Sequence, residues 1–157
     1  MNERERALLR QIGRTARVMY SAFEAEVGYA LPRWRILQAL YENRRMTQKE
    51  LVKVLAMDPG ALTRQMKTLE AEGLITRDPN PDDNRVTVAA LTPAGTALIA
   101  RTQPMRQAFS QKALAGLRAN QLDATMNILK TLEERFLGMY TAHVGSDARR
   151  KRRQRKI

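Results

Sequence analysis

The chain has 157 residues, which suits one compact domain, or a small module whose additional helices need a partner to bury their apolar faces. Its 28 Lys and Arg against 16 Asp and Glu give a net charge of +12, which favours a polyanionic partner. The sequence has no cysteine, which excludes disulfides and thiolate metal ligands, and no apolar run approaches the roughly 20 residues of a membrane-spanning helix. The charged start also lacks the apolar core of a secretory signal, so we expect a cytoplasmic protein with no membrane partner.

The first two predicted helices lie on either side of a glycine. Apolar side chains recur in steps of three and four over residues 7–27, which predicts a helix with one apolar stripe. Gly28 then interrupts the chain. Pro32 fits the first turn of a second helix that ends near Asn43.

Two short helices follow, each with a clear start signal. Thr47 and Glu50 have the spacing of a capping box, which predicts a helix over residues 48–56. Asp58 can accept from free backbone amides and Pro59 suits a first helical position, so a further helix begins there.

A hairpin is predicted directly after these helices. Gly73 supplies the left-handed residue that ends the second short helix. Residues 74–77 and 86–91 have the pattern of two strands, and residues 78–85 that of a polar turn between them. Two short capped helices followed by a hairpin predict a winged helix-turn-helix domain over residues 31–92.

The C-terminal third is predicted to be helical. Thr92 and Pro93 cap a long helix, in which Pro104 should cause a bend or an interruption. A last helix begins near Asn120 and ends near His143, whose imidazole would cap the exposed carbonyls.

The predicted fold is therefore mainly α, with a small β-hairpin wing. The apolar stripes of the first and the last two helices are too long for a short winged domain to cover. We expect residues 1–30 and 93–146 to form a helical dimerisation region, and the protein to be a homodimer. The block at 149–156, in which seven of eight residues are basic, is typical of a solvated arm, so residues 147–157 are expected to form a flexible tail. Such an arm could also add DNA affinity without sequence discrimination.

The second short helix is the candidate recognition helix. With Leu62, Met66 and Leu69 on its inner side, a rotation of 100° per residue turns a small and basic face outward. Arg64 on that face could pair bidentately with a guanine, and Arg85 in the wing could enter the minor groove, held extended by an adjacent carboxylate. The alternatives are an ordinary solvated helix surface and a plain turn with a surface ion pair. The candidate DNA-contacting residues are Thr47, Gln48, Gly60, Ala61, Thr63, Arg64, Lys67, Thr68, Asp83 and Arg85.

Several segments together resemble one family. They are LPRWRIL (31–37), TQKEL (47–51), residues 58–75, DNR (83–85) and LTPAG (91–95). On these motifs the sequence resembles the MarR family of bacterial transcriptional regulators over roughly residues 8–143. The resemblance implies a two-fold dimer built from the N- and C-terminal helices that binds a pseudopalindromic operator, usually as a repressor released by a small molecule. Pro104 and the basic tail depart from the family pattern.

The resemblance also implies an effector pocket where the dimerisation helices meet the winged domain, often for small aromatic acids. Aromatic and apolar side chains could line it, and an arginine could bind a carboxylate. The alternative is that the apolar members are simply core, and that the two arginines contact phosphates or Glu24 and Glu26. The candidate effector-binding residues are Arg17, Tyr20, Phe23, Arg33, Trp34 and Leu37.

No residue pattern indicates catalysis. The single histidine, His143, has no nucleophile beside it, and the sequence has no glycine-rich phosphate loop and no metal-ligand motif. We expect a ligand-responsive, DNA-binding transcriptional regulator acting at the nucleoid, without catalytic activity, metal or cofactor. The alternatives are a nonspecific nucleic-acid-associated basic protein that binds through its tail, and a winged-helix adaptor for proteins.

Overall fold

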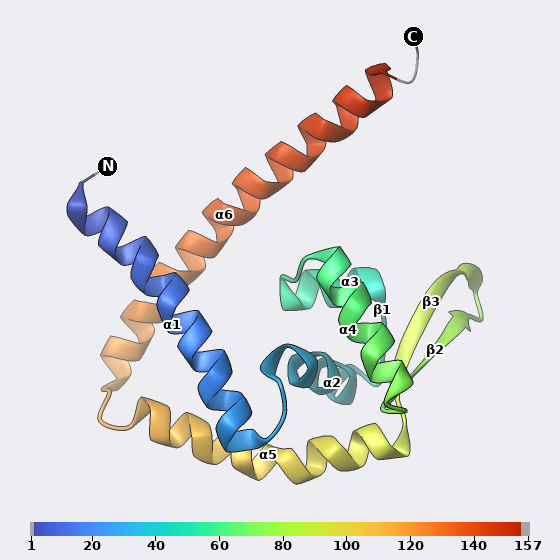
Figure 1. Cartoon of the computed structure of the whole chain (residues 1–157), viewed down its shortest axis with the longest axis horizontal. Coiled ribbons are helices and arrows are strands. Elements are labelled where there is room, and N and C mark those ends of the chain that lie inside the picture. Colours follow the sequence, from blue (N-terminus) through green and yellow to red (C-terminus); the bar gives the residue numbers. More distant parts are fainter. Residues whose placement is uncertain (1, 155–157) are drawn as a thin grey trace. The chain divides into compact units, whose positions relative to one another are not determined.

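The computed structural model describes the backbone of residues 2–154 and the side chains of residues 2–83 and 85–141. The chain is mainly helical with one small antiparallel sheet (Figure 1), as predicted. It divides into two compact units after Ala113. The elements are α1 (Glu3–Val27), α2 (Leu31–Asn43), β1 (Arg45–Thr47), α3 (Gln48–Leu55), α4 (Pro59–Ala71), β2 (Ile75–Asn80), β3 (Asp83–Leu91), α5 (Pro93–Leu114) and α6 (Ala119–Gln154).

The core of the first unit is built from one face of each element that surrounds α2. Phe23 meets Trp34 edge to face, with ring centroids 5.5 Å apart, and meets Phe109 in the same way at 5.4 Å. The indole Nε1 of Trp34 donates to the buried Thr102 hydroxyl at 2.9 Å, so this polar pair is satisfied inside the core. The largest fully buried side chains are Ile36, Leu37, Leu40, Leu51, Leu62, Met66, Leu69 and Ile99.

Local capping explains where the two short helices begin and end. The Thr47 hydroxyl accepts from the Glu50 amide at 3.2 Å and the Glu50 carboxylate accepts from the Thr47 amide at 2.7 Å, which confirms the predicted capping box at α3. The Asp58 carboxylate accepts from the Ala61 amide at 2.8 Å and starts α4. Gly73, at φ +69°, ends α4 as predicted, because its amide donates to the Glu70 carbonyl.

The sheet is larger than predicted. The three residues of β1 pair with β3, in the register Met46↔Ala89, and this strand was not expected from the sequence. The turn predicted for residues 78–85 was wrong in its length, because β2 extends to Asn80 and β3 begins at Asp83. β2 is an edge strand of the order β1-β3-β2, and an edge tolerates polar residues and proline such as Pro79.

The long helices differ from two expectations. Of the bend or interruption predicted at Pro104, the interruption does not occur: the proline lies inside α5, where Thr102 before it and Phe109 after it both pack against the core. α6 continues past His143 to Gln154, so this histidine does not stand at a helix end, and the backbone of residues 147–154 is helical. The arginines and lysines of this segment are good helix formers, which accounts for the extension. Residues 155–157 of the expected tail lie outside the described part of the chain. Over the part that is described, no helix combines the length and the hydropathy needed to cross a bilayer.

Candidate nucleic-acid interface

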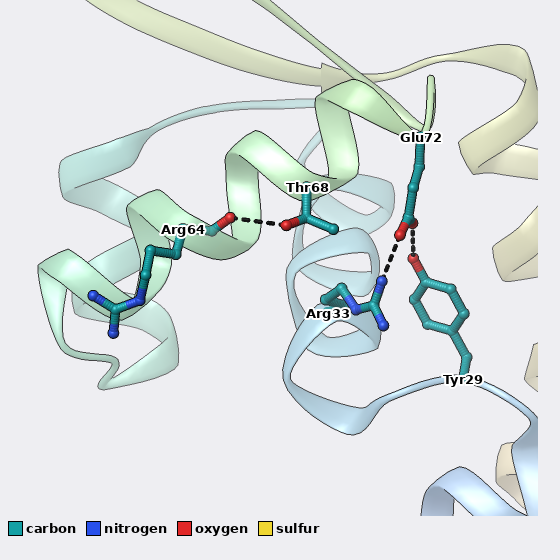
Figure 2. A network of polar contacts seen from close by, with 5 residues as sticks. All are labelled: Tyr29, Arg33, Arg64, Thr68 and Glu72. Carbon is teal, nitrogen blue, oxygen red and sulfur yellow. Dashed lines mark hydrogen bonds and ion pairs between the residues drawn. The ribbon is translucent and has the colours of Figure 1, made fainter.

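α4 has one buried face and one exposed face. Leu62, Met66 and Leu69 are at most 1% exposed, as the sequence predicted for the inner side. On the other side Gly60, Arg64, Lys67 and Thr68 are exposed, and Ala61 and Thr63 are half-buried. In Figure 2 the Arg64 side chain extends from α4 well away from the end of the helix that carries Glu72. The outer face therefore presents two cations and small side chains to solvent.

Gly60 leaves the start of α4 without a side chain beside the Asp58 cap. A Cβ at Gly60 would lie 3.2 Å from the Asp58 carboxylate, which is the group that caps the helix. A side chain here would crowd that cap. The Ala61 amide is bound by that cap and the Leu62 amide by the Asp58 carbonyl, so at the start of α4 it is the Gly60 amide that is placed to meet a phosphate or a base edge.

Gln48 and Thr63 link the two helices of the helix-turn-helix. The Gln48 side-chain amide donates to the Thr63 hydroxyl at 2.5 Å, and that hydroxyl donates to the Pro59 carbonyl at 2.8 Å. Thr47 is occupied by the capping box of α3. These three candidates are therefore engaged inside the protein, and the hydrogen bond between Gln48 and Thr63 connects α3 to α4 before any DNA is bound.

The wing residues are arranged differently from the prediction. The Asp83 carboxylate accepts from the backbone amide of Arg85 at 3.0 Å. It was expected to pair with the Arg85 guanidinium, and the structure shows no ion pair between these two described side chains. Asp83 thus shapes the backbone of the wing, while the Arg85 side chain is exposed.

A hollow of about 690 Å³ lies between the start of α3 and the wing. Four cations line it, and only Arg85 among them was a candidate from the sequence. Lys49 and Lys53 are four residues apart on α3, which places them on one helix face, but which face meets the wing depends on the tertiary fold. Arg77 also contacts Glu70 at 3.4 Å. The lining residues are Thr47, Gln48, Lys49, Glu50, Lys53, Arg77, Arg85, Val86 and Thr87.

One carboxylate shares the hollow with these cations. The pKa of Glu50 is lowered by the hydrogen bond from the Thr47 backbone amide and, second, by the one from the Thr47 hydroxyl. Glu50 is therefore ionised at neutral pH and is committed to the cap of α3. Because Glu50 is engaged in the cap, Lys49 and Lys53 can bind an anion such as a phosphate.

The six candidate effector-binding residues are not gathered around one cavity. Phe23, Trp34 and Leu37 are 3%, 4% and 0% exposed and fill the core with each other and their neighbours. Tyr20 is 41% exposed and Arg17 is exposed, whereas Arg33 is bound to Glu72 and not to Glu24 or Glu26. This placement favours the core interpretation for the three apolar residues. The effector site itself stays a prediction.

Two short capped helices, an exposed basic face on the second of them and a β-hairpin wing define a winged helix-turn-helix DNA-binding protein. The family model described as "MarR family" matches residues 30–87. The uncharacterized HTH-type transcriptional regulator YdgJ of Bacillus subtilis (strain 168) is 30% identical over 125 residues, which are 80% of this chain and 76% of YdgJ. The chain belongs to the MarR family of transcriptional regulators.

Further relatives agree in fold and in role. The HTH-type transcriptional repressor Rv2887 of Mycobacterium tuberculosis (strain ATCC 25618 / H37Rv) is 28% identical over 125 residues, covering 80% of this chain and 90% of the repressor. A crystal structure of a MarR mutant from Escherichia coli with operator DNA has a TM-score of 0.74 and 26% identity, covering 80% of this chain and 93% of that one. The two relatives are named as transcriptional regulators, a role that requires no catalysis, and the Escherichia coli MarR mutant is described in complex with operator DNA.

Proposed function

We propose that this regulator is a homodimeric repressor that binds a pseudopalindromic operator on the chromosome, in the cytoplasm, and leaves it when a small molecule binds. The observation that carries the proposal is the outer face of α4, where Arg64 and Lys67 are exposed while the opposite face is buried in the core. The Escherichia coli MarR structure with operator DNA supports the same use of the fold.

The face of α4 and the hollow are suited to different parts of a duplex. Arg64 can donate two parallel hydrogen bonds to the O6 and N7 of a guanine in the major groove. Lys49, Lys53 and Arg85 surround a space that admits a backbone phosphate, and a phosphate contact adds affinity without reading sequence. We assign base recognition to α4 and phosphate binding to the hollow.

The dimer is supported by apolar surface that each unit leaves exposed. α1 exposes Leu8, Leu9 and Met19, and α6 exposes a stripe that includes Met126, Leu129 and Phe136. A second copy of the chain is the partner that would cover the same surfaces on both molecules by two-fold symmetry. Two recognition helices would then read half-sites about 34 Å apart, roughly one turn of DNA.

The effector is proposed to be a small aromatic carboxylate. The support is limited to α1, on which Arg17 and Tyr20 are exposed and lie one turn apart, so that a guanidinium and a phenol can meet one ligand. Arg33 contributes less to this proposal than the sequence suggested, because its guanidinium is already paired. The measurement is the release of operator DNA when benzoate or a hydroxybenzoate is added. We expect these compounds to release DNA from the wild type and to release none from Arg17→Ala.

A fluorescence titration tests the central proposal. The purified protein is titrated into labelled DNA from upstream of its own gene and into a random duplex of equal length, at physiological salt. We expect binding to the upstream DNA at least about a thousandfold tighter than to the random duplex. Equal affinity for the two would overturn sequence-specific repression.

The alternative function, a nonspecific nucleic-acid-associated basic protein, is distinguished by removing residues 148–157. If that deletion abolished binding to both duplexes, the basic end of the chain would be the main contact. We expect instead that the preference for the operator is retained and that the dependence of affinity on salt becomes shallower, because fewer counterions are released.

A further inference from the structure

Three residues form a polar cluster at the end of the recognition helix, which we call the α4 clamp: Tyr29, Arg33 and Glu72. The Tyr29 hydroxyl donates to Glu72 Oε2 at 2.9 Å, and Arg33 Nη1 donates to Glu72 Oε1 at 2.5 Å. The Arg33 guanidinium also lies over the Tyr29 ring, 5.1 Å from its centroid. Figure 2 shows Tyr29, from the α1–α2 loop, and Arg33, from α2, converging on Glu72, which directly follows α4.

The two charges of the α4 clamp are placed against the helix dipoles. Glu72 is the C-cap of α4, where the negative end of the dipole disfavours a carboxylate. Arg33 is the third residue of α2, where the positive end disfavours a cation. Each charge alone weakens the helix that carries it. Their pairing compensates for this cost, so helix stability does not explain why these residues stand there.

The tyrosine completes the pairing as a fixed donor. Burial raises the pKa of Tyr29, and the hydrogen bond to Glu72 raises it further, so the hydroxyl keeps its proton throughout the physiological range. Both carboxylate oxygens of Glu72 are thereby occupied, one by each partner.

The α4 clamp acts on a helix end that is also held from the other side. Thr92 donates from its hydroxyl to the Gly73 carbonyl at 2.7 Å and from its amide to the Leu74 carbonyl at 3.0 Å. Arg64 lies eight residues before Glu72 on α4, with the other outward-facing candidates on either side of it. The orientation of α4 relative to this anchored end therefore determines the position of the Arg64 side chain.

We propose that Tyr29, Arg33 and Glu72 are positioning residues that hold α4 in the orientation needed to read the operator, and so set sequence specificity. This proposal rests on the proposed function. Through Tyr29, the loop that follows α1 is connected directly to the end of the recognition helix. Nothing in the α4 clamp needs to touch a base.

Glu72→Gln tests the proposal because electrostatics and positioning predict opposite changes in operator affinity. Removing a negative charge near the DNA-binding face should, by electrostatics alone, tighten binding to every duplex. Loss of positioning should instead weaken operator binding roughly fivefold while random-duplex binding is unchanged or tighter. Glu70→Gln is the matched control, since it removes the same charge two residues earlier on α4, where the partner is Arg77 at 3.4 Å. We expect it to lose no operator preference.

Tyr29→Phe and a charge exchange complete the test. Tyr29→Phe removes one hydroxyl and no charge, so weaker operator binding with unchanged random-duplex binding and an unchanged melting temperature would support positioning. R33E and E72R each place like charges together and should lose operator preference, while the double variant R33E/E72R restores an ion pair and should recover part of it. A double variant as poor as the worse single variant would count against the proposal.

The failures are distinguishable. A wild-type protein with no operator preference overturns the proposed function and this proposal with it. A wild type that prefers its operator, with Glu72→Gln and Tyr29→Phe variants that keep the full preference, overturns the positioning role alone.

Discussion

The winged helix-turn-helix region and the long helix α6 use their apolar residues in opposite ways. Leu62, Leu69 and their neighbours in the first region are sealed from water by α2 and the sheet. On α6 none of the side chains described, up to residue 141, is buried, and Phe136 is 45% exposed. The first region is complete within one chain, whereas the exposed stripe of α6 is the surface on which the proposed dimer depends. Folding and assembly should therefore respond to different substitutions.

The largest effect is expected from breaking the core of the winged region. Leu69→Ala leaves a cavity under α4, because the side chain is fully buried, and should lower the free energy of unfolding by about 2–5 kcal/mol. Urea unfolding measures it. Val54→Ala, at a side chain that is 59% exposed on α3, is the control and should cost less than about 0.5 kcal/mol. Similar values for the two variants would contradict the packing described for α4.

The next effect concerns assembly. Phe136→Ala should weaken self-association by about 2 kcal/mol or more, since a large aromatic in the middle of an exposed stripe is the kind of residue that dominates an interface. Sedimentation over a dilution series measures the change. Thr131→Ala, on the opposite face of α6, should leave the association constant as it is. A Phe136→Ala protein that associates like the wild type would remove this stripe from the proposed interface.

Substitutions on the DNA-binding face should change DNA affinity without changing folding or self-association. Arg64→Ala is expected to weaken operator binding by about 1–3 kcal/mol and to reduce discrimination between operator variants. Arg85→Ala should weaken binding to all duplexes to a similar degree and make the salt dependence shallower. Titrations against the operator, single-base variants and random DNA separate the two patterns. Equal behaviour of the two variants would refute the division between base reading and phosphate binding.

The smallest effect is expected in the pH dependence of the free energy of unfolding. The pKa of Glu50 is lowered from 4.5 in the folded protein by the bonds from Thr47, so ionised Glu50 stabilises the fold above its unfolded pKa. That contribution disappears as the pH falls through the lower folded value. Glu50→Gln should thus be less stable than the wild type at pH 7, with a difference that closes as the pH is lowered through the folded pKa of Glu50. Glu134→Gln, exposed on α6, controls for the loss of a surface charge.

Local signals in the sequence predicted the helix-turn-helix well. The capping box of Thr47 and Glu50, the Asp58 cap and the left-handed Gly73 each depend on residues within a few positions of one another. The buried face of α4 followed from helical periodicity alone. Interactions of short range in the sequence leave a pattern that can be read from it.

The features that were missed depend on distant partners. The three residues of β1 form a strand only because β3 accepts them, and Asp78 and Pro79 extend β2 because they lie on a sheet edge. Arg33 and Glu72 are 39 residues apart, and no local pattern relates them. The hollow likewise joins Lys49 and Lys53 of α3 to Arg85 of the wing. Such groupings are set by tertiary packing.

Gly95 has a consequence for motion in the winged region. A Cβ at this position would lie 2.1 Å from the Leu74 carbonyl oxygen, so the first turn of α5 is seated directly on the short connection between α4 and β2 with no side chain between them. With 13 residues and a rise of about 1.5 Å each, α4 is a lever roughly 20 Å long. A tilt of about 10° at this joint would carry the far end of α4 about 3.5 Å, more than the length of a hydrogen bond to a base. A rotation of α5 that tilted α4 in this way would therefore shift the start of the recognition helix by the length of a base contact.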